Sequence, residues 1–318
     1  MQAERVRFSF KRALADWSYR AHSSNGGRRC LRARTLLGQG VGGTRIIGSL
    51  CAAHNLPPMS ILSERQRDEA ARLLLAARGS GRPGSRLPES CRPLTPEDAL
   101  AIQRRVQGTL REATGGWKCS LPTPERPAAC APIFASTICR SSPCTVLAHG
   151  PTVRIEPEIA FVLGRDLPPR AAPYGEGEVR AAIAETRLVL ELLDSRYADP
   201  SVVSFPELLA DQISNQGLFV GSVLTDGLDA PLEGFRVVIE GGQRTLHERD
   251  GRHPDGHPLR PLVWLASFLA SRGEALAAGQ IVTTGSYAGA LEVPLAASLH
   301  VRCGELGSIA VEFVATRR

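Results

Sequence analysis

Two amphipathic helices are predicted in the first third of the chain. Apolar residues recur at helical spacing in "SERQRDEAARLLLAARGSG", residues 63–81, and Ser63 forms a capping box with Gln66 at its start. The second helix begins after Thr95, which caps it, and places Pro96 at the first helical position. Its predicted buried stripe consists of Ala99, Ile102, Val106 and Leu110.

Strands with a few helices between them are predicted over the rest of the chain. Residues 120–150 are rich in Pro, Ser and Cys, which is typical of a loop with one short element. The predicted strands lie within residues 152–164, 187–195, 217–224, 235–242, 243–248, 280–293 and 298–314, and the predicted helices are residues 175–186, 205–213 and 257–273. Irregularly spaced strands with few helices favour an α+β fold with a mixed, curled sheet over a doubly wound fold.

Two acidic residues interrupt the apolar strand "TVRIEPEIAFVLG". Glu156 and Glu158 are two positions apart, so their side chains share one face of the strand. Two carboxylates placed in this way repel each other unless a cation lies between them. Pro157 cannot donate to a ladder, which indicates a sheet edge or a bulge. The spacing by itself favours a solvated outer face over a functional site.

The next acidic strand shifts that balance. Glu191 lies among leucine and valine in "VLELLDSR", where a glutamate either reaches water at an edge or binds a cation. Three carboxylates in one pocket suit a hard divalent cation such as Mg²⁺ or Mn²⁺, and zinc is disfavoured because no His or Cys lies near these acids in sequence. Asp194 and Arg196 are expected either to pair in support of this site or to form an ordinary salt bridge.

Six sequence blocks carry a family resemblance. They are "GWK" (116–118), "IEPEIAFVLGRDLP" (155–168), "ELLDSRYAD" (191–199), "ADQISNQGLFVG" (210–221), "HPLRPLVWLASFLASRGEALAAGQIVTTGS" (257–286) and "LGSIAVEF" (306–313). In this order they resemble the 2-keto-4-pentenoate hydratase family, within the fumarylacetoacetate hydrolase-like superfamily. The resemblance runs from about Met59 to the end, and the joint order is more specific than any single block. It implies a mixed curled β-sheet roll, like the C-terminal part of fumarylacetoacetate hydrolase, after an N-terminal helical segment.

The resemblance also implies a metal site and an acid/base residue. Glu156, Glu158 and Glu191 match the family's ligands for one divalent cation, Mg²⁺ or Mn²⁺, and are the acids isolated above. Lys118, after Gly-Trp, matches the family's active-site lysine, a candidate general acid/base. A lysine near a metal in a closed pocket is expected to have a lowered pKa.

Three further positions are substrate-binding candidates. Ser286 in "TTGS" matches a hydroxyl that contacts substrate in the superfamily, and an ordinary turn serine is an equal alternative. Asp211 and Asn215 are weaker candidates for the same pocket. An acid that is common in the family is replaced near Ser136, which leaves the proton-transfer partner of the lysine open.

The activity that the resemblance implies is that of a hydro-lyase. The enzyme adds water to a small-molecule 2-hydroxy-2,4-dienoate, of 2-keto-4-pentenoate type, to give a 4-hydroxy-2-oxo acid in the catabolism of aromatic compounds. A 4-oxalocrotonate-type decarboxylase ranks second, and a non-catalytic metal-binding homologue is a further alternative. A C–C bond hydrolase needs a base that activates water, usually a histidine with a carboxylate, and it ranks third among the enzymes because no histidine lies at lid-like spacing in the loop before the strand of Glu156 and Glu158. His253 and His257 are predicted to be loop histidines. Family precedent suggests a homo-oligomer.

Charge and cysteine content bound the setting of the protein. The net charge of the 318 residues is +6, but residues 1–58 hold ten basic and two acidic side chains. We therefore predict a disordered or mis-started leader at residues 1–58, with a targeting peptide as the alternative, and a catalytic domain at residues 59–318. The remainder is almost neutral, which gives no electrostatic case for nucleic acid. No apolar run spans a membrane, and eight cysteines without a CxxC pair indicate reduced thiols in a cytoplasmic protein.

Overall fold

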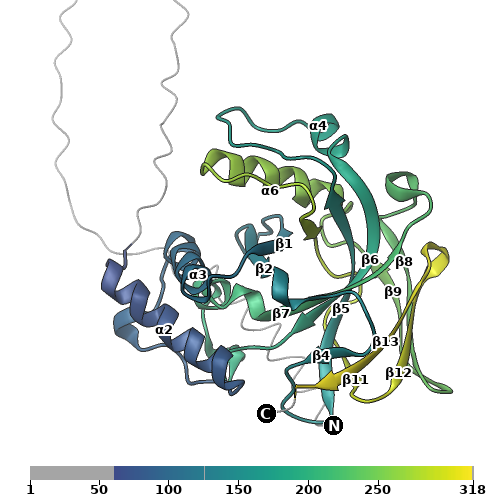
Figure 1. The fold of residues 1–318 in the computed structure, drawn as a ribbon, viewed down its shortest axis with the longest axis horizontal. Coiled ribbons are helices and arrows are strands. Elements are labelled where there is room, and N and C mark those ends of the chain that lie inside the picture. Colours follow the sequence, from purple (N-terminus) through teal and green to yellow (C-terminus); the bar gives the residue numbers. More distant parts are fainter. Residues whose placement is uncertain (1–60, 125, 317–318) are drawn as a thin grey trace, which may run out of the picture. The chain divides into compact units, whose positions relative to one another are not determined.

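The computed structural model describes residues 61–124 and 126–316, and the predicted leader, residues 1–58, lies outside them. The α-helices are α2 (Glu64–Ser80), α3 (Pro96–Leu110), α4 (Glu176–Arg180), α5 (Phe205–Ala210) and α6 (Leu259–Ser271). The strands are β1 (Thr114–Ser120), β2 (Ala129–Phe134), β3 (Ile138–Cys139), β4 (Cys144–Val146), β5 (Thr152–Leu163), β6 (Ile183–Leu193), β7 (Asn215–Val223), β8 (Gly234–Gly241), β9 (Arg244–Arg252), β10 (Ile281–Thr283), β11 (Leu291–Pro294), β12 (Ser298–Cys303) and β13 (Ser308–Ala315), most of which are labelled in Figure 1.

Two sheets form the body of the protein. The larger has the strand order β2-β1-β10-β5-β6-β7-β3, with β11 also paired to β5, and the smaller has the order β4-β13-β12-β8-β9. Pairing is mixed, because β1 runs parallel to β10 whereas β5 and β6 are antiparallel. The larger sheet curls until β2 contacts β7, so its two ends approach each other (Figure 1). The predicted α+β fold, with a mixed curled sheet and an N-terminal helical segment, is confirmed.

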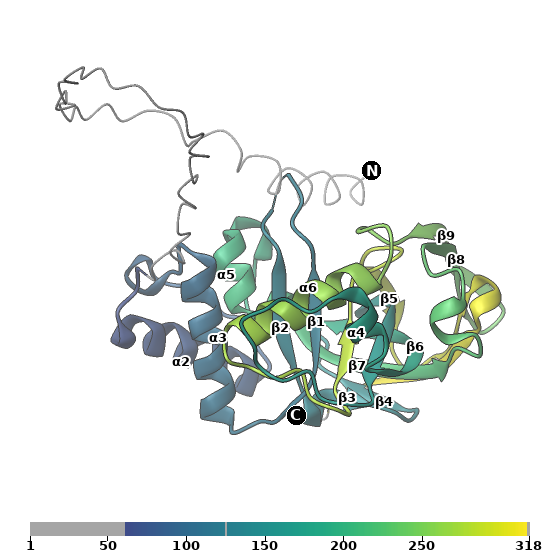
Figure 2. The same ribbon diagram turned by 90° about the horizontal axis from the view of Figure 1, so that it is seen from above.

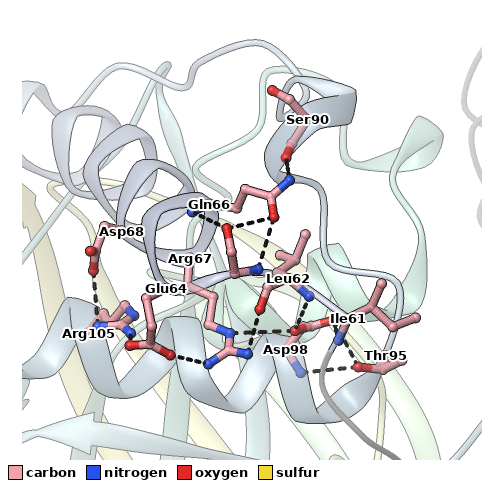
Figure 3. Close-up of polar contacts among 11 residues, drawn as sticks. Ile61, Leu62, Glu64, Gln66, Arg67, Asp68, Ser90, Thr95, Asp98 and Arg105 are labelled. Carbon is pink, nitrogen blue, oxygen red and sulfur yellow. Dashed lines mark hydrogen bonds and ion pairs between the residues drawn. The ribbon is translucent and has the colours of Figure 1, made fainter.

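Polar contacts at the helix ends join α2 to α3 (Figure 3). The predicted capping box at Ser63 is present, and Thr95 accepts a hydrogen bond from the backbone N–H of Asp98. The buried Asp98 carboxylate also accepts hydrogen bonds from the backbone N–H groups of Ile61 and Leu62, each at 3.1 Å. The chain that enters α2 is thereby tied to the first turn of α3.

Apolar packing attaches this helical segment to the sheet. Ile102 and Val106 of α3 lie in one cluster with Phe134 of β2 and Leu209 of α5. Leu110, the fourth residue of the predicted stripe, is exposed because it is the last residue of its helix. A larger core fills the space between the two sheets and extends to α6, which lies beside β1 (Figure 2).

The predicted helix over residues 175–186 is too long. α4 covers only five residues, and β6 begins at Ile183. β6 pairs with the central strand β5 almost along its whole length, including Glu185 opposite Val162. The ladder hydrogen bonds therefore outweigh the helical propensity of "AAIAET".

The segment predicted as loop, residues 120–150, contains strands β2, β3 and β4. All six residues of β2 are buried, because the strand pairs with β1 and lies under the helical segment. The free thiols among residues 61–124 and 126–316 are Cys91, Cys119, Cys130, Cys139, Cys144 and Cys303. Within the same residues, none of the helices has the length and apolar character that a membrane span requires.

Candidate metal and proton-transfer site

Three glutamates meet on neighbouring central strands of the larger sheet. Glu156 and Glu158 lie on one face of β5, and Glu191 of β6 stands directly opposite Glu156 in the antiparallel register. Each contributes a carboxylate oxygen, and these oxygens all lie within 4.8 Å of one another. Glu158 and Glu191 are buried, and Glu156 is half-buried. The acidic pair is thus on the inside of the curled sheet and not on a solvated outer face.

Pro157 lies in a central strand, at neither an edge nor a bulge, so that prediction is wrong. β5 pairs with β6 on one side throughout this region. On its other side, β11 pairs with β5 up to Ile155, and β10 pairs with it from Ala160. Pro157 falls in the gap between them, where a missing N–H donor removes no ladder hydrogen bond. The loop from β10 to β11 fills this gap, and the Tyr287 N–H donates to the Pro157 carbonyl at 3.2 Å.

The same loop holds the side chain of Glu158. Its Oε2 accepts hydrogen bonds from the Thr283 hydroxyl and from the Gly285 N–H, the latter at 2.9 Å. Thr283 is the last residue of β10 and is completely buried. Two donors therefore fix the orientation of one carboxylate before any ion binds.

Glu191 is completely buried and has one oxygen without a partner. Its Oε1 accepts hydrogen bonds from Lys118 Nζ and from Asn215 Nδ2, the latter at 2.9 Å. Its Oε2 is inaccessible and has no hydrogen-bond partner among the described residues. A buried carboxylate oxygen left in this way is destabilising. A cation between the three carboxylates would supply the missing partner, so these residues fit a hard divalent metal ion.

Burial and mutual repulsion raise the carboxyl pKa values. Burial and then the charge of Glu191 raise the pKa of Glu156 to about 7. Burial, then Glu191 and Glu156, raise the pKa of Glu158 to about 8. Without a cation between them, these carboxyl groups therefore retain protons close to neutral pH.

We expect the affinity for Mg²⁺ to rise with pH between about pH 6 and pH 8, because binding must displace protons from Glu156 and Glu158. Isothermal titration calorimetry in two buffers with different ionisation enthalpies measures the number of protons released. An affinity that is independent of pH, with no proton release, would contradict the assigned ligands.

The same shifts set the sign of a stability change. Both carboxyl groups have a higher pKa in the folded chain than the 4.5 of an ordinary glutamate. Between about pH 4.5 and about pH 8, the folded state therefore binds more protons than the unfolded state. The free energy of unfolding of the metal-free protein falls as pH rises through this range. Thermal unfolding in a chelator at about pH 5.5 and about pH 8.5 tests this sign.

Lys118 reaches the glutamates across the inside of the roll. Gly116 has no room for a side chain, since a Cβ there would lie 2.3 Å from the Ile281 carbonyl oxygen. This close approach lets β1 pair in parallel with β10. From β1, Lys118 Nζ donates to the carboxylate of Glu191 and to the Ile213 carbonyl oxygen, the latter at 3.3 Å.

The pKa of Lys118 is raised by the surrounding charges, which is the opposite of the predicted direction. Burial lowers the pKa of Lys118, but the charges of Glu191, Glu156 and Glu158 together raise it above its ordinary value. A divalent cation bound to those carboxylates would neutralise them and so favour the predicted direction.

The choice of lysine at this position is itself informative. The chain has 36 arginines and only two lysines, Lys11 and Lys118. Arginine stays protonated under all ordinary conditions, whereas a lysine ammonium can release its proton. A buried lysine in an arginine-rich chain is therefore consistent with proton transfer. This composition is a sequence signal that could have pointed to Lys118 without any family resemblance.

The chain next to this lysine is strained. α5 is shorter than the predicted helix of residues 205–213, and the tight turn Gln212–Ser214 follows it. Gln212, Ile213 and Ser214 have φ angles of 54°, 53° and 60°, in the left-handed region that favours glycine. Such residues each cost about 1–3 kcal/mol and persist where surrounding contacts impose them.

The substrate-binding candidates differ in their surroundings. Asn215 contacts the metal-ligand candidate Glu191 directly. The Ser286 hydroxyl donates to the Gly289 carbonyl oxygen at 3.3 Å, within the turn after β10. Asp211 is buried, and its carboxylate binds the guanidinium of Arg196. Asn215 alone of these three side chains has a hydrogen bond to one of the glutamates among the described residues.

The predicted pair of Asp194 and Arg196 is not formed. Arg196 binds Asp211 and also donates to the Asn215 carbonyl oxygen at 2.8 Å. Asp194 Oδ1 instead lies 2.8 Å from Nε2 of His149. Two positions just after the end of β6 thus point to different partners, because the chain leaves the strand here.

Two residues in and around the chain segment that holds Glu158 were given no role in the site from sequence. Thr283 binds Glu158, and it belongs to the "TTGS" block of which only the serine was selected. His253, predicted to lie in a loop, is buried, with Nε2 3.4 Å from the Thr284 hydroxyl. Burial lowers the pKa of His253 to about 4, so its ring is neutral. The pattern "HPDGHP" contains no sign of this burial.

The chain is similar in sequence to known hydratases. A 2-keto-4-pentenoate hydratase from Paraburkholderia xenovorans (strain LB400) is 29% identical over 269 residues, which cover 79% of this chain and 96% of that protein. The resemblance to the 2-keto-4-pentenoate hydratase family is confirmed. A hydratase of the same name from Burkholderia vietnamiensis (strain G4 / LMG 22486) is 29% identical over 95% of its length and 77% of this chain. No family model matches the sequence.

A second group of relatives carries a different activity. A 4-oxalocrotonate decarboxylase from a Pseudomonas species is 34% identical over 165 residues, 51% of this chain and 61% of that protein. The chain therefore matches less than two thirds of that relative's length. The solved structure of the 4-oxalocrotonate decarboxylase from Pseudomonas putida G7, complexed with magnesium and adipate, has the same fold. It superimposes with a TM-score of 0.65 at 23% identity and covers 80% of this chain and 99% of that one.

Proposed function

We propose that this protein is a divalent-metal-dependent hydratase that adds water to a 2-hydroxy-2,4-dienoate and forms a 4-hydroxy-2-oxo acid. The observation that carries the proposal is the buried group of three glutamates with Lys118 in direct contact with Glu191. Support comes from the hydratases to which the chain is similar, since they align over nearly their whole length. In this role the protein would act in the cytoplasm, in the catabolism of aromatic compounds, as a homo-oligomer.

The proposed ligands are Glu156, Glu158 and Glu191, and the proposed ion is Mg²⁺ or Mn²⁺. When bound, the ion supplies a Lewis acid that acidifies the enol of the substrate and stabilises negative charge on its oxygen. A magnesium-bound decarboxylase of the same fold supports this choice of ion class. The chain's own contribution is to hold two of the three carboxylates in fixed orientations through Thr283, Gly285 and Asn215.

The proposed role of Lys118 is to move protons. In the first step, the 2-hydroxyl proton leaves and the terminal carbon C5 gains a proton, which gives a 2-oxo-3-enoate. In the second step, the oxygen of water bonds to C4 and releases a proton, and C3 gains a proton. Lys118 is the one amine among the described residues, and its ammonium is held by Glu191 and by the Ile213 carbonyl oxygen. It can donate a proton in one step and be restored through water in the other.

A second candidate function is decarboxylation of 4-oxalocrotonate. It is favoured by the relative with 34% identity, which carries that activity, and by the shared fold. In this reaction the bond to the departing carboxylate breaks and CO₂ leaves with the electron pair staying on the dienolate. Lys118 would then protonate a carbon, so the same residues serve both reactions.

One assay with the full chain separates these functions. The purified protein is mixed with Mg²⁺ or Mn²⁺, and the absorbance of 2-hydroxypenta-2,4-dienoate and of 4-oxalocrotonate is followed separately. We expect metal-dependent loss of the first substrate, with a 4-hydroxy-2-oxo acid as product. Release of CO₂ from the second substrate alone would establish the decarboxylase instead. Inactivity on both, with metal bound, would indicate the non-catalytic metal-binding homologue.

A further inference from the structure

The strained turn Gln212–Ser214 is held by an arginine from the N-terminal helical segment. Arg78 of α2 donates from Nη2 to the side-chain oxygen of Gln212 and, at 3.4 Å, to the Asn215 carbonyl oxygen. Its guanidinium lies over the ring of Phe134, 5.2 Å from the ring centre. Gln212 is itself buried, and its Nε2 donates to the Pro132 carbonyl oxygen at 3.3 Å.

The turn Gln212–Ser214 and the residue that follows it contact Lys118 and Glu191. The Ile213 carbonyl oxygen accepts a hydrogen bond from Lys118 Nζ at 3.3 Å. Two residues further on, Asn215 donates to the Glu191 carboxylate. A left-handed φ at Ile213, a β-branched residue, requires contacts that impose it. The contacts of Arg78 and Gln212 are placed to do so.

Arg78 is half-buried, and the loss of water around its charge separates it from an ordinary surface arginine. Burial, and then the nearby charge of Arg196, lower the pKa of Arg78 to about 9. Its hydrogen bonds go to a side-chain amide oxygen and a carbonyl oxygen, and no ion pair of Arg78 with a carboxylate occurs among the described residues. A neutral side chain would fill this position at lower cost if only packing were needed.

Arg78 and Arg196 bind different side chains at this turn. Arg196 binds Asp211 and the Asn215 carbonyl oxygen, so it secures the two ends of the segment. Arg78 also reaches the Asn215 carbonyl oxygen, but it alone of the two binds the side chain of Gln212, between those ends. Loss of Arg78 is therefore expected to release the peptide before Ile213 while the ends remain attached.

We propose that Arg78 is a positioning residue, which holds Gln212 so that the Ile213 carbonyl oxygen orients the ammonium of Lys118. This inference rests on the proposed function in one respect, the acid/base role of Lys118. It extends the site to the helical segment, since α2 then contributes to proton transfer without touching the substrate.

The low number of lysines provides a direct test. Selective ¹³Cε-lysine labelling of the full chain gives two signals in an NMR spectrum, from Lys11 and Lys118. In Arg78→Met, we expect the Lys118 signal to shift or broaden and the Lys11 signal to stay unchanged. Arg72→Met is the matched control, because Arg72 lies on the same helix, is exposed and binds only Glu69 among the described residues. It should change neither signal.

Kinetics with the dienoate provide the second measurement. We expect kcat to fall by about 10- to 100-fold in Arg78→Met, with KM and the Mg²⁺ dissociation constant changed less than about threefold. Gln212→Met removes the other side of the contact and should give the same loss. The double variant should lose no more than either single variant, because both act through one contact.

An unchanged Lys118 signal in folded Arg78→Met and Gln212→Met would overturn the proposal. Equal loss of metal binding and of kcat would also overturn it, because it would assign Arg78 to the fold of the whole site. If the wild-type protein proves inactive on the dienoate, the proposed function fails, but the labelled-lysine measurement still decides whether Arg78 positions Lys118.

Discussion

Lys118→Arg is expected to abolish turnover of the dienoate while leaving the fold and the metal site in place. Arginine keeps a positive charge beside Glu191, so the buried carboxylate retains a cationic neighbour. It cannot release a proton near neutral pH, which stops its use as an acid and a base. We expect kcat to fall by about 10²- to 10⁴-fold, the usual contribution of a positioned acid/base group. Steady-state loss of dienoate absorbance measures the change.

A second variant separates the charge of Lys118 from its proton. Lys118→Met removes both and fits the space of the lysine stem better than arginine does. Because the ammonium competes with a cation for Glu191, Mg²⁺ binding should be kept or strengthened in this variant. Full activity in Lys118→Arg would show that the proton comes from elsewhere. If both variants lost their activity and also their Mg²⁺ binding, Lys118 would be a structural residue of the metal site.

Local patterns were sufficient to predict the framework of this site. Glu156 and Glu158 share a face because strand side chains alternate, and that alternation needs no knowledge of the fold. The caps at Ser63 and Thr95 are also local, since each side chain bonds to a backbone group within three residues. The apolar run around Glu191 pointed to the third acid, and the family resemblance then added Lys118. The contact between these two joins residues 73 positions apart.

Contacts that depend on the curl of the sheet could not be predicted. Lys118 meets Glu191 because β1 and β6, which are not neighbours in the sheet, face each other across the roll. Arg196 pairs with Asp211 and not with Asp194 as predicted, because the pairing depends on where the chain turns after β6. The pattern and spacing of residues contain no information on the distance from Lys118 to Glu191 or from Arg196 to Asp211.

The prediction for Pro157 was wrong for the same reason, because it depended on which strands lie beside β5. The rule that proline avoids central strands holds only where its missing N–H would be needed. β5 has two successive partners on one side, and Pro157 lies between their ends. The sequence contains the proline but not the gap, so an edge or a bulge was the natural and incorrect expectation. The gap also admits the loop that binds Glu158, so the proline is located where the site needs access.

Glu156→Gln is expected to weaken Mg²⁺ binding and to stabilise the metal-free protein at the same time. Within the described residues, Glu156 is the one glutamate of the three to which no hydrogen bond is donated, so an amide of equal size deprives no neighbouring donor of its acceptor. Removing one of three ligand charges should reduce affinity for Mg²⁺ by about 100-fold or more. Isothermal titration calorimetry at about pH 8, where the carboxyl groups are ionised, measures this loss.

The gain in stability follows from the raised pKa values. At pH above about 7, wild-type Glu156 is ionised in the folded protein although burial and Glu191 oppose it. The amide removes that repulsion and also part of the shift on Glu158, to which Glu156 contributes. The free energy of unfolding in a chelator should therefore rise by about 1–3 kcal/mol at about pH 8 and change little at about pH 5.

Opposite signs in the two measurements distinguish a metal ligand from a structural residue. A residue needed only for the fold would lower stability and metal affinity together when it is changed. Glu292→Gln is the matched control, because Glu292 is an exposed glutamate on β11, which also pairs with β5. It should alter neither quantity. If Glu156→Gln bound Mg²⁺ as tightly as the wild-type protein, Glu156 would not be a ligand, and the acidic pair on β5 would need another explanation.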